Sequence, residues 1–284
     1  MQITGQTQIV GIIGDPIKHS RSPQIHNAAI TALGLDYVYV AFHVQPDNLG
    51  AAIEGFKATN VVGINVTIPH KQNVISYLDE ISREATLIGA VNTLIFKDGG
   101  IIGENTDAPG FLQAMEEEGL DVPQGGSAVI IGAGGSARAV VVALALAGIR
   151  TICIANRTVS RAVTLATDLS EQTDASIYGI GLDDPKLSNA VGTSQLIVNT
   201  ASTSMDVSHP LLIDPEWLEP QSIVYDIVYT PPETRLLQAA AEKDCHTIGG
   251  LGMLVHQGAI AFEKWTGVNP PVETMRQALQ GAFD

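Results

Sequence analysis

An apolar strand that runs into a glycine-rich turn and then into an apolar helix constrains this chain more than any other feature. The strand covers residues 129–131, the turn contains Gly132 and Gly134, and the helix covers residues 139–147. With Ala137, this forms the Gly-x-Gly-x-x-Ala pattern in the strand–turn–helix setting of dinucleotide-binding folds. Gly132 permits the tight turn, and Gly134 lets the backbone approach a pyrophosphate. The helix N-terminus supplies N–H groups and a positive dipole end for the phosphates.

The end of the next strand indicates which dinucleotide binds. The strand at residues 151–155 ends in Asn156-Arg157-Thr158, with Arg161 one turn later. NAD-binding proteins usually place a carboxylate here, on the ribose 2′-hydroxyl. A guanidinium instead binds a 2′-phosphate bidentately, whereas a carboxylate would repel it. An ordinary Gly-rich turn is the alternative reading, but the strand, glycines, helix and Arg157 together favour NADP as the cofactor.

The overall charge excludes some partners. The 284 residues suffice for two domains, and 45% hydrophobic with 16% charged residues is typical of a globular protein. A net charge of −15 argues against nucleic acid or an anionic membrane as a partner. An anionic cofactor therefore needs local positive charge, for which Arg138, Arg157 and Arg161 are suitably placed.

The cysteines and histidines predict neither a disulfide framework nor a metal site. Cys153 and Cys245 are isolated, which indicates a reducing compartment. The histidines show no metal-ligand spacing, so we expect no bound metal. The longest apolar run, residues 139–149, is too short to cross a bilayer, and no signal peptide is recognisable. We expect a cytoplasmic protein.

The order of expected elements predicts an α/β protein with two domains. In the first part we expect strands at residues 9–13, 37–44, 61–68, 92–96 and 101–104, and helices at 22–33, 46–57, 72–78 and 109–118. After a Gly- and Pro-containing boundary at 119–126, strands follow at 195–199, 223–228 and 247–248, with helices at 253–265 and 272–283. Alternating strands and helices predict parallel sheets covered on both faces.

Two clusters in the first part suit a small anionic substrate. Ser20 and Ser22 lie just before a helix, where two hydroxyls and helix N–H groups can bind a carboxylate. Simple helix capping by Ser22 before Pro23 is the alternative. Lys71 follows the strand at residues 61–68 and so lies at the strand end where open α/β sheets bind ligands. A solvated lysine is the alternative there.

Further polar residues allow two interpretations each. Asp107 either caps the helix that follows or takes part in chemistry. Asn92 is either a turn residue or a ligand contact. Gln257 lies on an otherwise apolar helix, where it either reaches a ligand or bonds to the backbone.

Taken together, these motifs strongly resemble those of the shikimate dehydrogenase family. The matching segments occur in family order and at similar spacing along nearly the whole chain, at residues 14–27, 65–71, 89–93, 105–107, 132–135, 156–158, 225–229 and 250–265. The family usually has Asn-Ala-Thr-Ser-x-Gly-Met after the fourth strand of the nucleotide domain. This chain differs there, with Asn199-Thr200-Ala201-Ser202-Thr203-Ser204-Met205.

The resemblance implies a reaction, a cofactor and a domain plan. The reaction is reversible reduction of 3-dehydroshikimate to shikimate with NADPH, in aromatic amino acid biosynthesis. The implied substrate domain is residues 1–118, joined by the returning C-terminal helices at 253–284. The implied Rossmann-like, doubly wound NADP domain is residues 119–252. A monomer or a homodimer is expected.

The resemblance also implies roles for individual residues. Lys71 and Asp107 would face the reacting carbonyl and its neighbouring hydroxyl. The remaining substrate contacts would be Ser20, Ser22, Thr67, Asn92, Tyr229 and Gln257. The cofactor contacts would be Gly132, Ala133, Gly134, Gly135 and Ser136 at the pyrophosphate, Asn156, Arg157, Thr158 and Arg161 at the 2′-phosphate, and Ile227 and Gly250 at the nicotinamide.

The implied chemistry gives Lys71 and Asp107 a role, and other features of the sequence argue against rival functions. The Lys71 ammonium can stabilise a developing alkoxide and deliver a proton, while Asp107 orients it. A quinate/shikimate dehydrogenase that uses NAD is disfavoured by Arg157. A methylenetetrahydrofolate dehydrogenase is disfavoured because the two serines suit a small acid better. A non-catalytic NADP-binding sensor would be expected to have lost Lys71 or Asp107.

Overall fold

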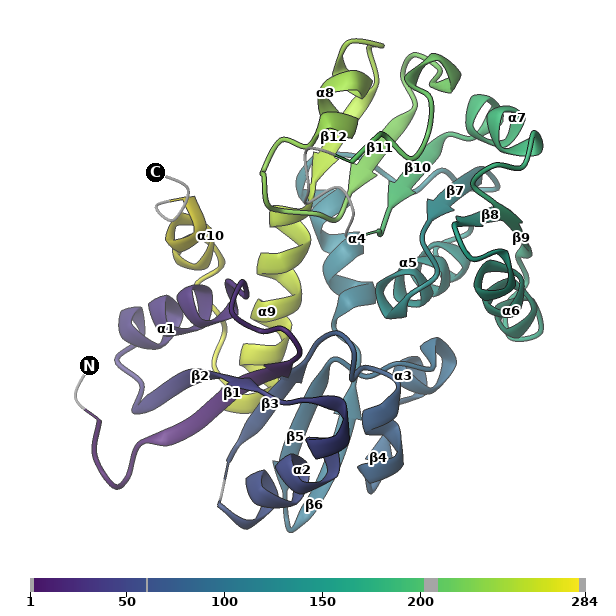
Figure 1. Ribbon diagram of the computed structural model, residues 1–284. Helices are drawn as coiled ribbons and strands as arrows, with labels where there is room; N and C mark the ends of the chain where they lie inside the picture. Colours follow the sequence, from purple (N-terminus) through teal and green to yellow (C-terminus); the bar gives the residue numbers. More distant parts are fainter. Residues whose placement is uncertain (1–2, 60, 202–208, 281–284) are drawn as a thin grey trace. The chain divides into compact units, whose positions relative to one another are not determined.

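The computed structural model describes residues 3–59, 61–201 and 209–280. The chain forms two compact units (Figure 1). The first unit combines residues 1–110 with residues 254–284, and the second covers residues 111–253. The chain passes from one unit to the other within helices α4 (Asp107–Glu117) and α9 (Gly250–Thr266). As predicted, the C-terminal helical segment returns to the first unit.

The first unit is built around a six-stranded sheet of order β2-β1-β3-β5-β6-β4. Its strands are β1 (Gln8–Gly14), β2 (Tyr37–His43), β3 (Gly63–Val66), β4 (Glu80–Ile81), β5 (Thr93–Lys97) and β6 (Gly100–Glu104). Its helices are α1 (Ser22–Ala32), η1 (Pro46–Asn48), α2 (Leu49–Ala58), η2 (Asn73–Tyr77), α3 (Arg83–Ile88) and α10 (Val272–Gln280).

This first sheet is mixed, so the prediction of parallel sheets holds for only part of this unit. Strands β1, β2 and β3 are parallel, but β5 runs antiparallel to both β3 and β6. The β5–β6 pairing follows from the two-residue turn Asp98-Gly99 between these strands. Both residues have positive φ, 51° and 79°, as hairpin turns of this length favour. A hairpin reverses the chain and therefore pairs its strands antiparallel.

Both faces of the first sheet are covered by helices. On one face, Leu49, Ile53 and Phe56 of α2 pack in a core with residues of β1 and β3. On the other face, Trp265 near the end of α9 donates its indole N–H to the Leu94 carbonyl at 2.9 Å. A Cβ on Gly63 would clash with that indole, so the close approach of α9 requires glycine. The C-terminal segment is thus part of this unit's core.

The second unit contains a parallel sheet of order β12-β11-β10-β7-β8-β9. Its strands are β7 (Ser127–Ile131), β8 (Thr151–Asn156), β9 (Ser176–Gly181), β10 (Leu196–Asn199), β11 (Ile223–Asp226) and β12 (His246–Gly249). Its helices are α5 (Gly135–Leu146), α6 (Val159–Ser170), α7 (Lys186–Thr193), η4 (Pro215–Trp217) and α8 (Arg235–Ala241). Numbered within this unit, the strand order is 3-2-1-4-5-6, which is the Rossmann topology.

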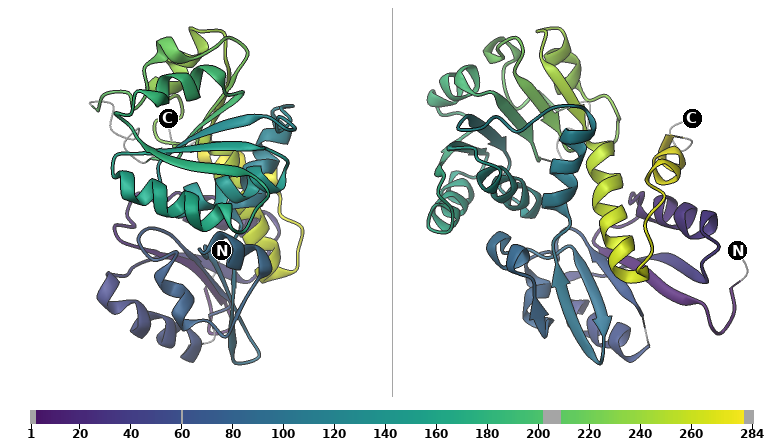
Figure 2. Two further views of the ribbon diagram at one scale, coloured as in Figure 1. Left: turned by 90° about the vertical axis from the view of Figure 1, so that its right-hand side faces the viewer. Right: turned by 180° about the vertical axis from the view of Figure 1, so that it is seen from behind.

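Helices cover both faces of this second sheet (Figures 1 and 2). Residues of α7 and α8, among them Leu187 and Leu237, pack with Val129 and Cys153 on one face. On the other face, α6 lies so close to β9 that a Cβ on Gly179 would clash with the backbone of Ala162. Burial raises the pKa of the Cys153 thiol to about 11. Cys153 is thus an unpaired core residue, as its apolar strand predicts.

Several element bounds differ from the predicted ones. The expected helix at 46–57 begins as the 3-10 turn η1 and becomes α-helical at Leu49, and the helical pattern at 72–78 is the 3-10 helix η2. The helix expected at 109–118 begins at Asp107. In the first unit, β4 and α3 were not expected, because elements of two and six residues carry too little periodicity to be recognised. In the second unit, β9, α6, α7 and α8 were not among the expected elements.

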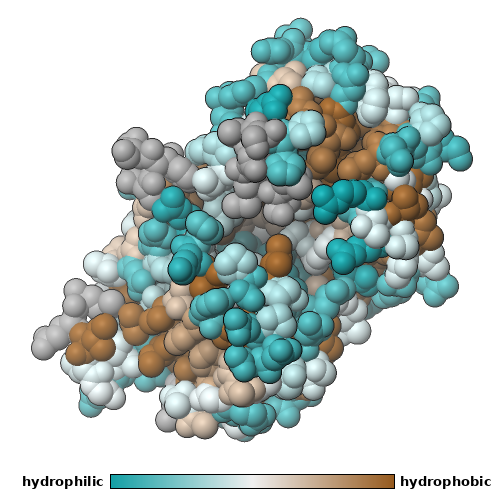
Figure 3. All heavy atoms as spheres, viewed as in Figure 1, coloured by the Kyte–Doolittle hydropathy of each residue, from teal (hydrophilic) through white to brown (hydrophobic). Residues whose placement is uncertain are grey.

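The molecular surface in the view of Figure 3 mixes hydrophilic and apolar residues. Exposed large apolar side chains come from separate elements; examples are Leu33, Val40, Ile68, Leu146 and Tyr178. Among the helices of the described residues, none has the length and apolar character needed to cross a membrane.

The buried His26 predicts a loss of stability in acid. His26 on α1 is fully buried and stacks on Tyr39, and burial lowers its pKa from 6.5 to about 3. Between these two pH values the unfolded chain binds a proton that the folded chain excludes, so stability falls as pH falls from 6.5 to 3. When the pH is lowered from 7 to 5, the free energy of unfolding of His26→Phe should therefore fall by about 2 kcal/mol less than that of wild type.

Urea unfolding of both proteins at each pH measures this difference, with the exposed His19→Phe as the matched control. A wild-type acid dependence equal to that of His26→Phe would contradict the assignment.

Candidate functional site

Lys71 and Asp107 form a buried ion pair in the first unit. Lys71 follows β3 and Asp107 is the first residue of α4. The Lys71 Nζ and Asp107 Oδ2 atoms are 2.5 Å apart, and the two side chains are only 11% and 7% exposed. The solvated-lysine interpretation is therefore wrong. A buried ammonium held beside a carboxylate can stabilise negative charge and exchange a proton.

Asn92 holds the other oxygen of the carboxylate. Its Nδ2 donates to Asp107 Oδ1 at 2.8 Å and to Thr106 Oγ1 at 3.0 Å. Its Oδ1 accepts from the Thr106 N–H at 2.8 Å, which fixes the direction of the amide. Asn92 is thus a buried member of the site, and the turn-residue alternative does not describe it.

The helix that begins at Asp107 is capped by a different residue. The side-chain oxygen of Asn105 accepts from the N–H groups of Asp107 and Ala108 at 3.0 and 3.3 Å. Its amide donates to the Ala90 carbonyl at 2.9 Å. Asn105 therefore does the capping that local signals assigned to Asp107, and the Asp107 carboxylate is left to Lys71 and Asn92.

Asn65 is a buried site residue missing from the predicted site residues. It lies on β3, is 4% exposed, and donates from Nδ2 to the Asn92 carbonyl at 3.2 Å and to Thr93 Oγ1 at 3.1 Å. A polar residue in an otherwise apolar strand was the available signal, because such a side chain must find buried partners.

Ser20 precedes α1, and Ser22 is its first residue and does not cap it through its hydroxyl. Helix α1 begins at Ser22, and Arg21 at its N-cap makes no side-chain cap bond. Instead, the Ser20 Oγ accepts from the Ser22 N–H at 3.3 Å. Ser22 is buried and Ser20 half-buried. The capping alternative for Ser22 is therefore wrong.

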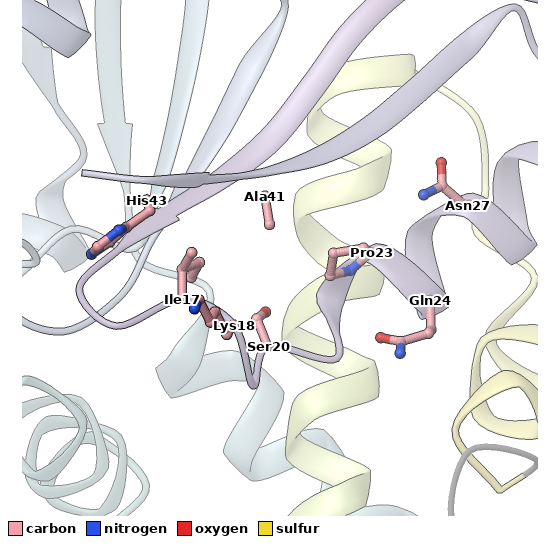
Figure 4. A pocket seen from close by; sticks show the side chains of 8 residues that line it. All are labelled: Ile17, Lys18, Ser20, Pro23, Gln24, Asn27, Ala41 and His43. Atoms are coloured by element: carbon pink, nitrogen blue, oxygen red, sulfur yellow. The ribbon is translucent and has the colours of Figure 1, made fainter.

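Ser20 also lines an open hollow of about 690 Å³ in the first unit (Figure 4). Its wall comes from the loop after β1, from α1 and from the end of β2: Ile17, Lys18, Ser20, Pro23, Gln24, Asn27, Ala41 and His43. The Lys18 ammonium and the Ser20 hydroxyl can both donate to an anion here. His43 Nε2 lies 2.6 Å from Asp15 Oδ1 at the rim.

The structure places the other predicted substrate contacts as follows. Thr67 is half-buried directly after β3, four residues before Lys71. Gln257 lies on α9 in the first unit, and its Nε2 donates to the Leu254 carbonyl at 2.7 Å. The backbone-bonding alternative thus describes this amide group. Tyr229 is half-buried and belongs to the second unit.

The glycine-rich turn of the second unit fits a dinucleotide. Gly132 has φ +109°, and a Cβ on it would lie 2.5 Å from Thr200 Oγ1, so only glycine suits this position. Gly134 precedes α5, and nothing lies within 4 Å of where its Cβ would be, so the backbone is open to a ligand. Ala137 is fully buried, as expected for close packing of α5 on the sheet.

The turn is also tied to the neighbouring strand at the point where strand order reverses. Thr200 follows β10, and both its N–H and its hydroxyl donate to the Ile131 carbonyl at 2.8 Å. The bond from the hydroxyl is made by Thr200 at a position where the family usually has alanine. Residues 202–205 of the variant loop lie outside the described residues.

The end of β8 exposes the predicted 2′-phosphate contacts. Arg157, Thr158 and Arg161 are exposed, and the Asn156 amide donates to the Thr158 carbonyl at 2.9 Å. Arg138, by contrast, pairs with Asp168 of α6 at 3.3 Å. Local positive charge near the turn therefore comes chiefly from Arg157 and Arg161.

A buried carboxylate shapes the segment that contains Ile227. Asp226 Oδ1 accepts from Asn199 Nδ2 at 2.8 Å and from the Val228 N–H at 3.1 Å, while Oδ2 accepts from Thr234 Oγ1 at 2.8 Å. A Cβ on Gly250 would clash with the Ile227 carbonyl. The two predicted nicotinamide contacts, Ile227 and Gly250, are therefore direct neighbours.

The second unit is a Rossmann-type dinucleotide-binding domain, and the first holds a buried lysine–carboxylate pair. Together they define a dinucleotide-dependent oxidoreductase.

Three family models match separate parts of the chain. They are the shikimate dehydrogenase substrate binding domain over residues 12–94, shikimate/quinate 5-dehydrogenase over residues 117–212, and the shikimate 5′-dehydrogenase C-terminal domain over residues 250–280. A shikimate dehydrogenase (NADP(+)) of Methanopyrus kandleri is 46% identical over 98% of this chain and 97% of its own length.

Solved structures agree. A shikimate 5-dehydrogenase from Listeria monocytogenes, in complex with shikimate and NAD, has a TM-score of 0.91 at 40% identity and 98% coverage of both chains. A shikimate dehydrogenase in complex with NADP+ has a TM-score of 0.91 at 43% identity, covering 100% of this chain and 98% of its own. The chain belongs to the shikimate dehydrogenase family, so the predicted family, fold class and oxidoreductase class are confirmed.

Proposed function

We propose that this chain catalyses reversible reduction of 3-dehydroshikimate to shikimate with NADPH, with Lys71 and Asp107 as its acid–base pair. Membership of the shikimate dehydrogenase family agrees with the predicted reaction and with NADP as cofactor. The observation that supports the assignment of residues most directly is the buried 2.5 Å contact between Lys71 and Asp107.

The bound cofactor supplies the hydride for this reaction. As the carbonyl carbon is reduced, its oxygen becomes negatively charged, and the Lys71 ammonium stabilises that charge and donates a proton. Asp107 accepts a hydrogen bond from Lys71 through Oδ2 and from Asn92 through Oδ1, which holds both groups in place. In the oxidation direction the same lysine takes the proton back.

The serine segment would bind the substrate carboxylate. Ser20 and Ser22 offer hydroxyl donors at the start of α1, and Lys18 at the hollow adds a cation. Thr67, Tyr229 and Gln257 are proposed as further contacts. A neutral analogue, such as the methyl ester of shikimate, should therefore bind much more weakly than the acid.

The second unit would hold NADP through the turn and the end of β8. Residues 132–136 would bind the pyrophosphate at the start of α5, and residues 156–158 with Arg161 would bind the 2′-phosphate. Ile227 and Gly250 would contact the nicotinamide. In functional terms we propose residues 1–118 with 253–284 as the substrate domain and residues 119–252 as the NADP domain.

The test of this function is loss of NADPH absorbance when 3-dehydroshikimate is added. We expect rapid loss with NADPH and little with NADH. Loss with NADH alone would overturn the cofactor assignment, and NADPH binding without turnover would indicate the non-catalytic sensor. Quinate with NADP+ in a parallel assay tests the broader quinate/shikimate specificity.

We also propose a cytoplasmic enzyme that is a monomer or a homodimer. The support is the pair of free cysteines, which suit a reducing compartment. Fractionation of cells that express the protein tests its location, and light scattering after size-exclusion chromatography tests its oligomeric state.

A further inference from the structure

The Tyr39 hydroxyl is buried in the first unit beside Asn65. Tyr39 is 2% exposed, and its ring stacks on His26 with the ring centroids 4.2 Å apart. The hydroxyl donates to Asn65 Oδ1 at 2.7 Å. One phenol therefore contacts the polar residues that lead to Asp107.

Strand register explains how Tyr39 reaches Asn65. In the sheet, β1 lies between β2 and β3 (Figure 1). Tyr39 on β2 pairs with Val10, and Asn65 on β3 pairs with Ile12. Val10 and Ile12 are two residues apart and so share a face of the sheet. Tyr39 lies on that same face and extends across β1 to Asn65, which pairs in turn with Thr93 on β5.

The direction of the Tyr39 hydrogen bond follows from the Asn65 amide. Asn65 Nδ2 lies 3.2 Å from the Asn92 carbonyl, which can only accept. Asn65 Oδ1 must then face Tyr39, so the phenol is the donor. Burial raises the pKa of Tyr39 well above its usual range, which keeps that proton in place.

The same direction continues to the acid–base pair. Thr93 Oγ1 accepts from Asn65 Nδ2 at 3.1 Å and donates to Asn92 Oδ1 at 3.0 Å. Asn92 Nδ2 then donates to Asp107 Oδ1 at 2.8 Å. Asn65, Thr93 and Asn92 each accept a hydrogen bond from the preceding side chain and donate one to the next. The hydrogen bonds therefore run from Tyr39 to the Asp107 carboxylate, which binds Lys71.

We infer that Tyr39 is a positioning residue that, through Asn65, Thr93 and Asn92, orients Asp107 beside Lys71. This inference rests on the proposed function. Tyr39 itself touches none of the reacting atoms, so it acts through these neighbours.

The Tyr39→Phe variant tests the inference because it removes one oxygen and keeps the ring stacked on His26. We expect kcat/KM for shikimate to fall about tenfold, the size of one lost buried hydrogen bond, mainly through a lower kcat. The dissociation constant for NADP+ should stay unchanged. The matched control is Tyr37→Phe on the same strand, which should behave as wild type.

A second variant interrupts the same pathway further along. Thr93→Val removes the hydrogen bonds that Thr93 makes with Asn65 and Asn92, so it should lower kcat and leave the KM for shikimate unchanged. Combining Thr93→Val with Tyr39→Phe should lower kcat by less than the product of the single effects, since both act on one pathway.

The outcomes separate the inference from a structural role and from the function itself. A Tyr39→Phe protein with a lower melting temperature but normal kcat would overturn the inference, as would independent effects of Thr93→Val and Tyr39→Phe on kcat. Wild-type protein is assayed first with shikimate and NADP+. If it binds both but does not turn over, the proposed function fails; if it turns over and Tyr39→Phe is normal, only this inference fails.

Discussion

The Lys71→Ala variant should lose about a thousandfold in kcat, or ~4 kcal/mol of transition-state stabilisation, with a smaller change in KM. The reason is that the ammonium acts on charge that develops only as the carbonyl is reduced. In the proposed function, binding of the ground-state substrate depends instead on the serine segment and on hydrogen bonds to the substrate hydroxyls. Steady-state kinetics with shikimate and NADP+ over a range of substrate concentrations measure both parameters.

Removing Lys71 also leaves the buried Asp107 carboxylate with Asn92 but without its cation, so stability must be checked. Circular dichroism and the melting temperature show whether the variant is folded at the assay temperature. The matched control is Lys97→Ala, which removes an exposed lysine from β5 of the same sheet. A folded Lys71→Ala protein with kcat within tenfold of wild type would remove Lys71 from the catalytic role.

The Arg157→Ala variant should bind NADP+ about 30-fold more weakly, since a charge-assisted bidentate contact to a phosphate is worth about 2 kcal/mol. Affinity for NAD+ should hardly change, because NAD+ has no 2′-phosphate to lose. The variant should therefore show a much smaller preference between the two cofactors. Titration of the cofactors, followed by fluorescence or calorimetry, gives both dissociation constants.

Arg150→Ala is the matched control for this experiment. Arg150 is also exposed but precedes the first residue of β8, whereas Arg157 follows the last. The two substitutions therefore change the net charge equally at opposite ends of one strand. If both variants lose NADP+ affinity to the same extent, the effect comes from overall charge and not from a contact at the 2′-phosphate.

The topology of the second unit was predictable from its first strand and turn. Strand β7 is a continuous apolar run, and the glycine-rich turn and α5 follow it directly. Strand β9 has no such run and was not predicted. The first unit was harder, because β5 returns antiparallel beside β3, and because β4 and α3 are too short to show a period. Its core also depends on Trp265, which lies 171 residues from its bonding partner Leu94.

The sequence by itself determined the Rossmann-like domain, the position of the phosphate-binding turn, the arginine in place of an acid, and the family. These are local features, in which the order of neighbouring residues dictates backbone conformation and charge. Only the tertiary structure decided that Asp107 pairs with Lys71 while Asn105 caps the helix, and that Asn65 and Tyr39 join the same hydrogen-bonded network. Local sequence allows Asp107 either role; the choice depends on which buried donors the folded sheet brings to its carboxylate.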